Sequence, residues 1–239
     1  MHIGNLEFRP SFAASLATLV ILPILLYLGF WQLGRADEKS RIMAQFAANA
    51  EGDALRLNAE VASHEDFRYQ VVQSHGSFLG GRQLLLDNQI EAGQPGFHVF
   101  TPFQTDEGDM ILVNRGWVPM DMHRDPVGDL RVDEKPRILR GVLNHPPDVG
   151  YRLDAVDASD WPRLVQYIDT EELSATLGQK LLPSIVWLDP QTPDGFVRQW
   201  KVVPFGPEKH LGYAVQWFGL AAALVGIYLI VNVKRSKPQ

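Results

Sequence analysis

The sequence predicts a membrane protein, a two-helix transmembrane hairpin that encloses one β-rich soluble domain. Two apolar segments, 10–34 and 210–233, predict the hairpin, because at about 1.5 Å per residue each reaches the roughly 30 Å of a bilayer core. Short runs rich in Val, Ile, Leu and Phe between them, broken by Gly, Pro, Asn and Asp, predict the β-rich domain. The length that remains suits one domain of ordinary size, so a second soluble domain is not expected.

The first apolar segment has the features of a retained anchor. Only Glu7 and Arg9 carry charge ahead of it, within a short tail of residues 1–9. No small-residue cleavage pattern follows it, and Trp31 and Gln32 stand at its exit, whereas a secretory signal would end in a cleavage site. The sequence ADEKSRIMAQFAANA continues with good helix formers, so we expect the helix to extend beyond the membrane as a stalk.

The distribution of charge predicts the orientation. Residues 35–209 hold 18 Lys and Arg against 27 Asp and Glu, and an acidic domain is a poor partner for nucleic-acid phosphates. A loop of this length crosses the membrane largely regardless of its charge, so the short basic tail 234–239 decides the orientation. We therefore expect both tails in the cytoplasm and residues 35–209 outside it. The chain has no cysteine. This fits an oxidising compartment and many others, so it does not indicate where the protein resides.

The β-rich domain is expected to be an α+β arrangement with mainly antiparallel strands, folded as a sandwich or a partial barrel. Its strand candidates recur about every dozen residues, with hairpin turns expected at LGGR and TDEGD. One short helix is expected at DTEELSATLG, where Asp169 is the N-cap and Leu173 and Leu177 lie four residues apart. A proline-containing elbow, VVPFGPEK, returns the chain to the membrane. The strand candidates are RYQVVQSHGSF, RQLLLDNQ, GFHVFTPFQT, DMILVNRGWVP, RILRGVLNHP and LPSIVWLDP.

Enzyme and metal motifs are scarce. The chain has no G-x-S-x-G elbow, Walker loop, G-x-G-x-x-G or H-E-x-x-H sequence. The histidines between the two segments are scattered, without carboxylates at metal-ligand spacing. A copper carrier would favour the sulfur atoms of cysteine and methionine as ligands. This chain has no cysteine and few methionines. These residues therefore disfavour copper as a ligand and show none of these common catalytic motifs.

An arginine stands inside the strand candidate VNRGWVP. Strand alternation would place Val113, Arg115 and Trp117 on one face. A charge between two large apolar side chains either faces outward from a strand that ends at Pro119, or pairs with a carboxylate or an anionic ligand group. Both interpretations stay open from these residues alone.

The second apolar segment has two unlike faces. At 100° per residue, the small-residue face suits close approach of the first span, with Gln216 available for an interhelical hydrogen bond. The histidine face combines an imidazole, small gaps and flat aromatics, which is how a helix offers a porphyrin an axial ligand and a slot. The alternative is an interfacial histidine with an aromatic belt that anchors the helix at headgroup depth. The histidine face holds His210, Ala214, Trp217, Ala221, Leu224 and Tyr228, and the small-residue face holds Gly212, Gln216, Gly219, Ala223 and Gly226.

Three motifs together resemble the surfeit locus protein 1 family: LGFWQLGRADEK at the exit of the first span, VNRGWVP in the domain and HLGYAVQWFGLA at the start of the second span. They stand in the family's order within the same two-span plan, so the resemblance covers essentially the whole chain. It implies a role in the assembly of haem-copper terminal oxidases, here a cytochrome c oxidase in a bacterial inner membrane. It also implies transient binding of haem a and its insertion into oxidase subunit I. The haem would be carried and not used for turnover, so we do not expect an enzyme. The implied partners are that subunit, the enzyme of haem a synthesis and membrane lipid.

By position, the resemblance makes His210 the axial ligand of the haem iron. Trp31 and Gln32 leave the first span at the depth where His210 enters the second, so we expect them to form the far wall of the pocket. Anionic propionates would lie at the membrane interface, close to cations. The expected pocket residues are Tyr213, Trp217, Trp31 and Gln32. The expected propionate partners are Arg35, Arg115 and Lys209.

Two other functions stay open from the sequence. A haem-free membrane scaffold would stabilise an oxidase assembly intermediate through its β-rich domain and the small-residue helix face, and absorption spectra would separate it from a haem carrier. An enzyme that modifies haem would need a proton-transfer or redox constellation, and none is readable in the chain.

Overall fold

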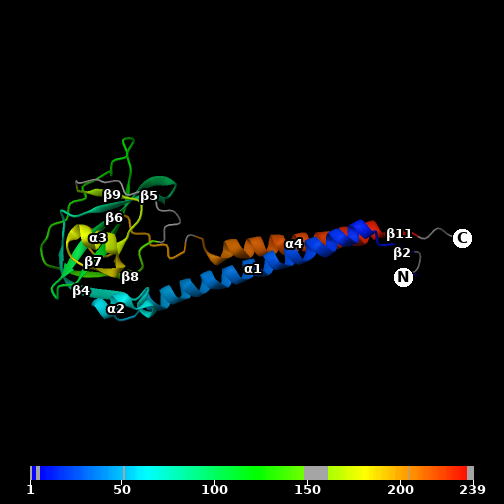
Figure 1. Ribbon diagram of the computed structural model, residues 1–239, viewed down its shortest axis with the longest axis horizontal. Coiled ribbons are helices and arrows are strands. Elements are labelled where there is room, and N and C mark those ends of the chain that lie inside the picture. The colour runs from blue at the N-terminus through cyan, green and yellow to red at the C-terminus, as the bar shows by residue number, and fades with distance from the viewer. Residues whose placement is uncertain (1, 4–5, 51, 148–160, 204, 236–239) are drawn as a thin grey trace. The chain divides into compact units, whose positions relative to one another are not determined.

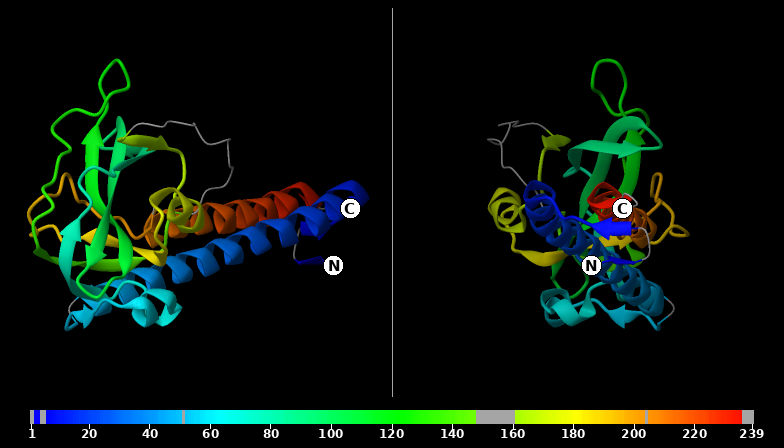
Figure 2. Two further views of the ribbon diagram at one scale, coloured as in Figure 1. Left: turned by 60° about the vertical axis from the view of Figure 1, so that its left-hand side comes forward. Right: turned by 90° about the vertical axis from the view of Figure 1, so that its right-hand side faces the viewer.

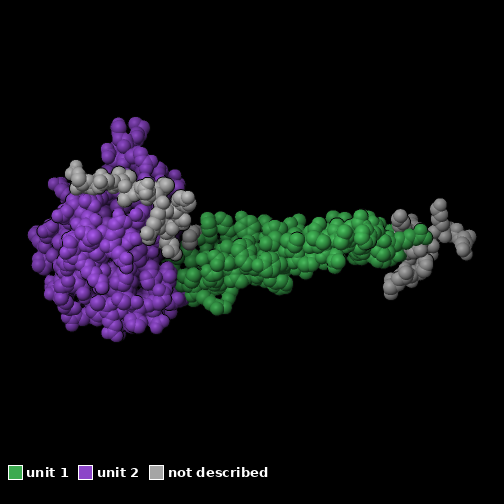
Figure 3. Space-filling view, viewed as in Figure 1, with its two compact units in different colours: residues 1–44, 202–239 green, residues 45–201 purple. Residues whose placement is uncertain are grey.

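The computed structural model describes residues 2–3, 6–50, 52–147, 161–203 and 205–235. The chain divides into two compact units (Figure 3). One comprises Met1–Ala44 with Val202–Gln239 and the other comprises Gln45–Lys201. The first contains a pair of long helices and the second contains a β-rich domain. The predicted combination of a two-helix hairpin with one β-rich domain is confirmed.

The hairpin consists of α1 (Phe12–Ala50) and α4 (Pro207–Asn232), which run antiparallel and side by side in the first unit (Figures 1 and 2). Both are long and apolar enough, by length and composition, to cross a membrane. α1 continues without interruption past Gly34 into the second unit. α4 begins directly after its N-cap, Gly206. Pro207 lies at the start of the helix, where a backbone N–H would have no acceptor within the helix, so the missing N–H of proline loses no hydrogen bond.

The two helices meet along the histidine face of α4. Ala214 and Ala221 on this face are buried. The Phe218 ring packs edge to face on Phe30, with ring centroids 5.3 Å apart. Gly29 lies beneath the same ring, where an added Cβ would come within 2.6 Å of it. The expectation that the small-residue face of α4 packs on the first span is therefore wrong.

Polar side chains explain why the histidine face is the one that packs. The hydroxyls of Tyr228 and Ser15 lie 2.9 Å apart, and the Asn232 Oδ1 accepts a hydrogen bond from the backbone N–H of Ser11 at 2.7 Å. In an apolar medium a polar group without a partner costs several kcal/mol, which outweighs the gain from close approach of small residues. The opposite face stays open: a Cβ built at Gly212, Gly219 or Gly226 would meet no atom within 4 Å.

The ends of the hairpin are joined by a small three-stranded sheet. β1 (His2–Ile3), β2 (Leu6–Phe8) and β11 (Val233–Arg235) pair antiparallel in the order β1-β2-β11. The first and last strands of the chain therefore lie together at the same end of the hairpin (Figure 1).

The second unit is a closed five-stranded barrel with additional strands at its edges. The barrel order is β4-β8-β10-β7-β6, and it closes because β6 pairs back with β4, with Phe103 opposite Phe78. All these pairings are antiparallel except β10 with β7, which is parallel. The barrel strands are β4 (Val71–Phe78), β6 (Gln94–Thr105), β7 (Met110–Pro119), β8 (Arg137–Asn144) and β10 (Leu181–Leu188). The added strands are β3 (Leu55–Arg56), β5 (Leu84–Glu91) and β9 (Arg163–Val165).

The central strands β7 and β10 are buried on both faces. Ile111 and Val113 belong to a cluster with residues from all five barrel strands, so they face the interior. Met110 and Leu112 belong to a second cluster outside the barrel, beneath α3 (Thr170–Leu177). Strands that are buried on both faces are expected to be apolar nearly throughout, which explains the runs MILV and LLPSIVWL. α3 has the predicted N-cap, because the Asp169 carboxylate accepts from two backbone N–H groups of its first turn.

One of the two expected hairpin turns is confirmed. TDEGD joins β6 to β7, and the backbone N–H of Gly108 donates to the carbonyl of Thr105. LGGR is wrong as a hairpin, because it joins β4 to β5, which do not pair with each other. The second hairpin joins β5 to β6 at Ala92–Gly93, in a sequence without the Asn-Gly or Asp-Gly signal. Two short elements, α2 (Ala59–Ser63) and η1 (Glu65–Phe67), precede the barrel.

Candidate functional site

His210 lies in the first turns of α4 and forms a hydrogen bond with α1. Its Nδ1 is 2.8 Å from the Oε1 of Gln32. An amide oxygen only accepts hydrogen bonds, so Nδ1 carries the hydrogen and donates it. In this tautomer the lone pair is on Nε2, which forms no hydrogen bond with any described residue. This nitrogen is available to a metal.

The His210–Gln32 pair lies at one end of the membrane-spanning part of the hairpin. The Asn232–Ser11 contact lies at the other end. The two polar contacts are separated by 21 residues on α1 and 22 on α4, which is roughly 32 Å of helix. This length is close to the thickness of a bilayer core, so we expect His210 and Gln32 at the membrane boundary.

Among the predicted pocket residues, the structure brings His210 and Gln32 together and leaves two others outside the helix contact. Trp217 is half-buried and shares the face of His210 about two turns further along α4. Tyr213 is 44% exposed and Trp31 is 49% exposed, so both lie on the outer surface of the hairpin. A ligand at His210 would find one flat aromatic side chain on the same helix face.

Two of the predicted cations stand beside the pair. Lys209 directly precedes His210, and its Nζ lies 3.6 Å from the centroid of the Phe205 ring. It pairs with no carboxylate among the described residues. Arg35 follows Gln32 by three residues and is 2.6 Å from the Glu38 carboxylate, with a partly exposed side chain. Of the two, Lys209 is the cation without a competing acid.

Arg115, the third predicted cation, lies in the interior of the β-rich domain. It is 2% exposed, and its Nε and Nη1 donate to the carbonyls of Asp194 at 2.7 Å and Leu130 at 2.9 Å. The guanidinium also lies 4.9 Å from the centroid of the Phe196 ring. Burial lowers its pKa to about 10, and the nearby Asp194 carboxylate opposes that shift. Arg115 is thus held by backbone carbonyls of its own domain.

A β-bulge explains where the Arg115 side chain goes. Relative to β6, β7 carries one extra residue between Asn114 and Trp117. Gly116 in the bulge has φ of 116°, and a Cβ there would come within 2.7 Å of the Val197 carbonyl oxygen. The simple alternation predicted for VNRGWVP is therefore wrong, because the bulge turns Arg115 between the barrel and the loops that cross it.

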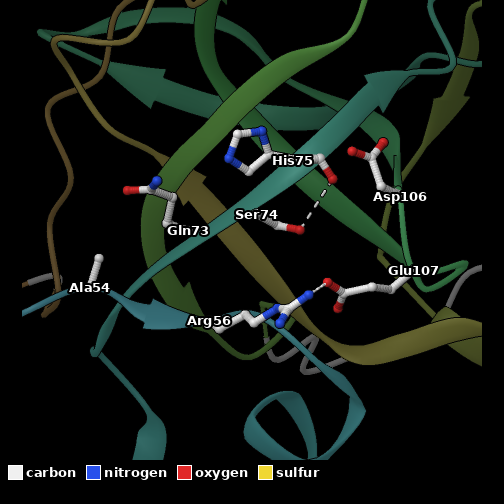
Figure 4. Close-up of a pocket in the computed structure, with 7 residues that line it drawn as sticks. All are labelled: Ala54, Arg56, Gln73, Ser74, His75, Asp106 and Glu107. Carbon is white, nitrogen blue, oxygen red and sulfur yellow. Dashed lines mark hydrogen bonds and ion pairs between the residues drawn. The ribbon is translucent and has the colours of Figure 1, made fainter.

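A polar hollow on the β-rich domain is a second concave site (Figure 4). Arg56 forms an ion pair with Glu107 across it. The Ser74 hydroxyl donates to the carbonyl of His75 and not to the imidazole, so no nucleophile and base are paired there. Within the part of the chain that the structure describes, no three His, Cys, Asp or Glu side chains are grouped to hold a metal. The lining residues are Ala54, Arg56, Gln73, Ser74, His75, Asp106 and Glu107.

Comparison with known proteins agrees with the resemblance carried by the three motifs. A family model described as the SURF1 family matches residues 19–222, from within α1 to within α4. The chain belongs to the SURF1 family. His210 and Gln32 both lie inside the stretch that matches the SURF1 family, as does the whole β-rich domain.

Individual SURF1 relatives cover the chain to different extents. A SURF1-like protein of Rickettsia felis is 31% identical over 233 residues, which cover 90% of this chain and 95% of that protein. A SURF1-like protein of Monosiga brevicollis is 22% identical over 90% of this chain and 87% of its own length. The cytochrome oxidase assembly protein SHY1 of Saccharomyces cerevisiae is 29% identical over 107 residues, 43% of this chain and 28% of SHY1.

Proposed function

We propose that this protein assists the assembly of cytochrome c oxidase by holding haem a at His210 and helping it into oxidase subunit I. Membership of the SURF1 family and the similarity to the yeast assembly protein SHY1 support the role in oxidase assembly. The observation that supports haem binding is the His210–Gln32 hydrogen bond of 2.8 Å. It places the hydrogen of the ring on Nδ1 and leaves Nε2 as the nitrogen that can bind iron.

The residues around His210 fit such a cargo. Trp217 offers a flat apolar surface on the same helix face, and Lys209 and Arg35 supply positive charge for the propionates. At the membrane boundary the apolar macrocycle stays out of water while the propionates reach it. When bound, haem would supply an iron centre that His210 would hold, and because the haem would be passed on without chemical change, we propose a carrier and not a catalyst.

The proposed setting is a bacterial inner membrane crossed twice, with the β-rich domain on its outer side. There the hairpin would meet oxidase subunit I and the enzyme of haem a synthesis, with membrane lipid around both helices. The basic tail supports this orientation, because short basic segments stay in the cytoplasm.

The test is the pyridine haemochrome spectrum of protein purified from cells that make haem a. We expect stoichiometric haem a in the wild type, and loss of most of it, or a displaced Soret band, in His210→Ala. The matched control is His123→Ala, because the His123 side chain is 81% exposed on the β-rich domain. A colourless wild type, or a His210→Ala spectrum that matches the wild type, would instead favour a haem-free scaffold.

A further inference from the structure

We propose that Gln32 is the positioning residue for the iron ligand: its amide oxygen fixes His210 as the Nδ1–H tautomer, so that Nε2 is the ligating nitrogen. This inference rests on the proposed haem site and adds to it a residue on the other helix. Ligating histidines in proteins generally donate their second ring N–H to an acceptor, which orients the ring and tunes its basicity. Gln32 Oε1, 2.8 Å from Nδ1, is that acceptor here.

The packing of the hairpin holds the acceptor in place. Ala214, one turn from His210, is 1% exposed against α1. Gly29, about one turn from Gln32, lets the Phe218 ring approach the α1 backbone. Small residues at these points allow the two helices to come close. The hydrogen bond between side chains 178 positions apart is therefore supported by helix contacts and not only by its own energy.

The choice of an amide acceptor has an electronic consequence. A carboxylate on Nδ1–H would push the ring toward imidazolate and strengthen its donation to iron, whereas a neutral amide leaves an imidazole of ordinary strength. An uncharged acceptor also costs less at the edge of an apolar medium than a carboxylate does. A carrier must release its haem, and a ligand of ordinary strength suits release.

The first experiment needs no haem. The full-length protein in lipid nanodiscs is labelled with 15N-histidine, and the ring nitrogen shifts of His210, assigned with His210→Ala, report the tautomer. We expect the Nδ1–H form in the wild type and its loss in Gln32→Leu. The control is Gln216→Leu, because Gln216 is an exposed glutamine on the other face of α4. A wild-type Nε2–H tautomer, or a Gln32→Leu spectrum like the wild type, would overturn the inference.

The second experiment uses haem-loaded protein and three variants. Gln32→Leu should weaken haem affinity by about 10- to 100-fold, which is the usual effect of losing such a partner. Gln32→Glu should restore the affinity and lower the reduction potential of the bound haem, while Gln216→Leu changes neither.

The outcomes separate the two proposals. Unchanged haem affinity and potential in Gln32→Leu, beside a His210→Ala variant that loses its haem, would overturn the role of Gln32 alone. Full haem retention in His210→Ala would overturn the haem site and the positioning role of Gln32 together.

Discussion

Arg115 shows how one buried charge can organise a region that has little regular structure. Two backbone carbonyls that accept its hydrogen bonds, those of Leu130 and Asp194, lie in two long connections, one after β7 and one after β10. A buried guanidinium is tolerated only when its donors are used, and here they are used on backbone oxygens of both connections. The single side chain therefore fastens two loops to the barrel.

Replacing Arg115 should cost stability even when the charge is kept. Lysine carries one nitrogen on a flexible stem and cannot present donors to the carbonyls of Leu130 and Asp194 in the planar arrangement of a guanidinium. We expect Arg115→Lys to lower the free energy of unfolding by about 3 kcal/mol, measured by urea titration with tryptophan fluorescence. The control is Arg131→Lys, because the Arg131 side chain is 90% exposed. Equal stability of the two variants would show that Arg115 does not hold the loops.

His98 should make the stability of the β-rich domain depend on pH. Burial holds its pKa below the ordinary value of 6.5, while its hydrogen bond to Asn114 and the charge of Glu91 oppose the shift. Below about pH 6.5 the unfolded chain takes up a proton that the folded chain resists, so stability falls as the pH falls. We expect the urea midpoint to decrease from pH 7 to pH 5, and this decrease to be smaller in His98→Gln.

The exposed Met122 provides the comparison for that measurement. It is 96% exposed and carries no titratable group, so Met122→Gln should leave the slope of stability against pH as in the wild type. A slope that His98→Gln does not change would place the acid sensitivity elsewhere in the domain.

At the scale of elements, the sequence of α4 has two faces that could pack against α1, and the sequence alone does not show which of them does. Small residues are common at membrane helix contacts, yet the structure turns Gly212 and Gly219 outward and packs the histidine face. The polar side chains on that face find partners on α1, and the register between α1 and α4 decides this. The sequence of a single helix does not determine its register against another helix.

The contact between α1 and α4 should be sensitive at Gly29 and insensitive at Gly219. A side chain at Gly29 collides with the Phe218 ring, whereas one at Gly219 meets open space. Because the chain has no cysteine, the pair Ser15→Cys and Tyr228→Cys reports the contact through a short bifunctional maleimide, since the tyrosine side chain that it replaces spans more than a disulfide can bridge. We expect Gly29→Leu to reduce this cross-link strongly and Gly219→Leu to leave it unchanged. The opposite ranking would mean that the small-residue face is the packed one.

Local patterns predicted most of the strands, and long-range contacts account for what they missed. Runs such as MILV identify strands because burial on both faces makes them apolar. The parallel pairing of β10 with β7 and the short edge strands β3 and β9 depend on contacts between distant segments. The candidate site divides in the same way. His210 was predicted from its motif and Gln32 from its depth, whereas the hydrogen bond between them depends on the register of two helices that are far apart in the chain.

At the scale of the whole molecule, the β-rich domain should fold without the hairpin. All three hydrophobic clusters lie within Gln45–Lys201, so a fragment of these residues keeps every member of them. We expect a fragment of these residues to unfold cooperatively in urea and to bind no haem a in a titration. A fragment that binds haem with the affinity of the full-length protein would place the haem site on the domain.

The membrane topology determines on which side of the membrane the proposed haem site lies. The chain ends are joined by β1, β2 and β11, and the tail that follows is basic, so both ends should stay in the cytoplasm. In spheroplasts, an impermeant maleimide should label Glu134→Cys without permeabilisation, and a cysteine added after Gln239 only with it. Leu220→Cys, exposed on α4 within the span, should resist labelling in both conditions. Because His210 lies at the end of α4 that leads to the β-rich domain, the reverse labelling pattern would move the ligand to the cytoplasmic boundary.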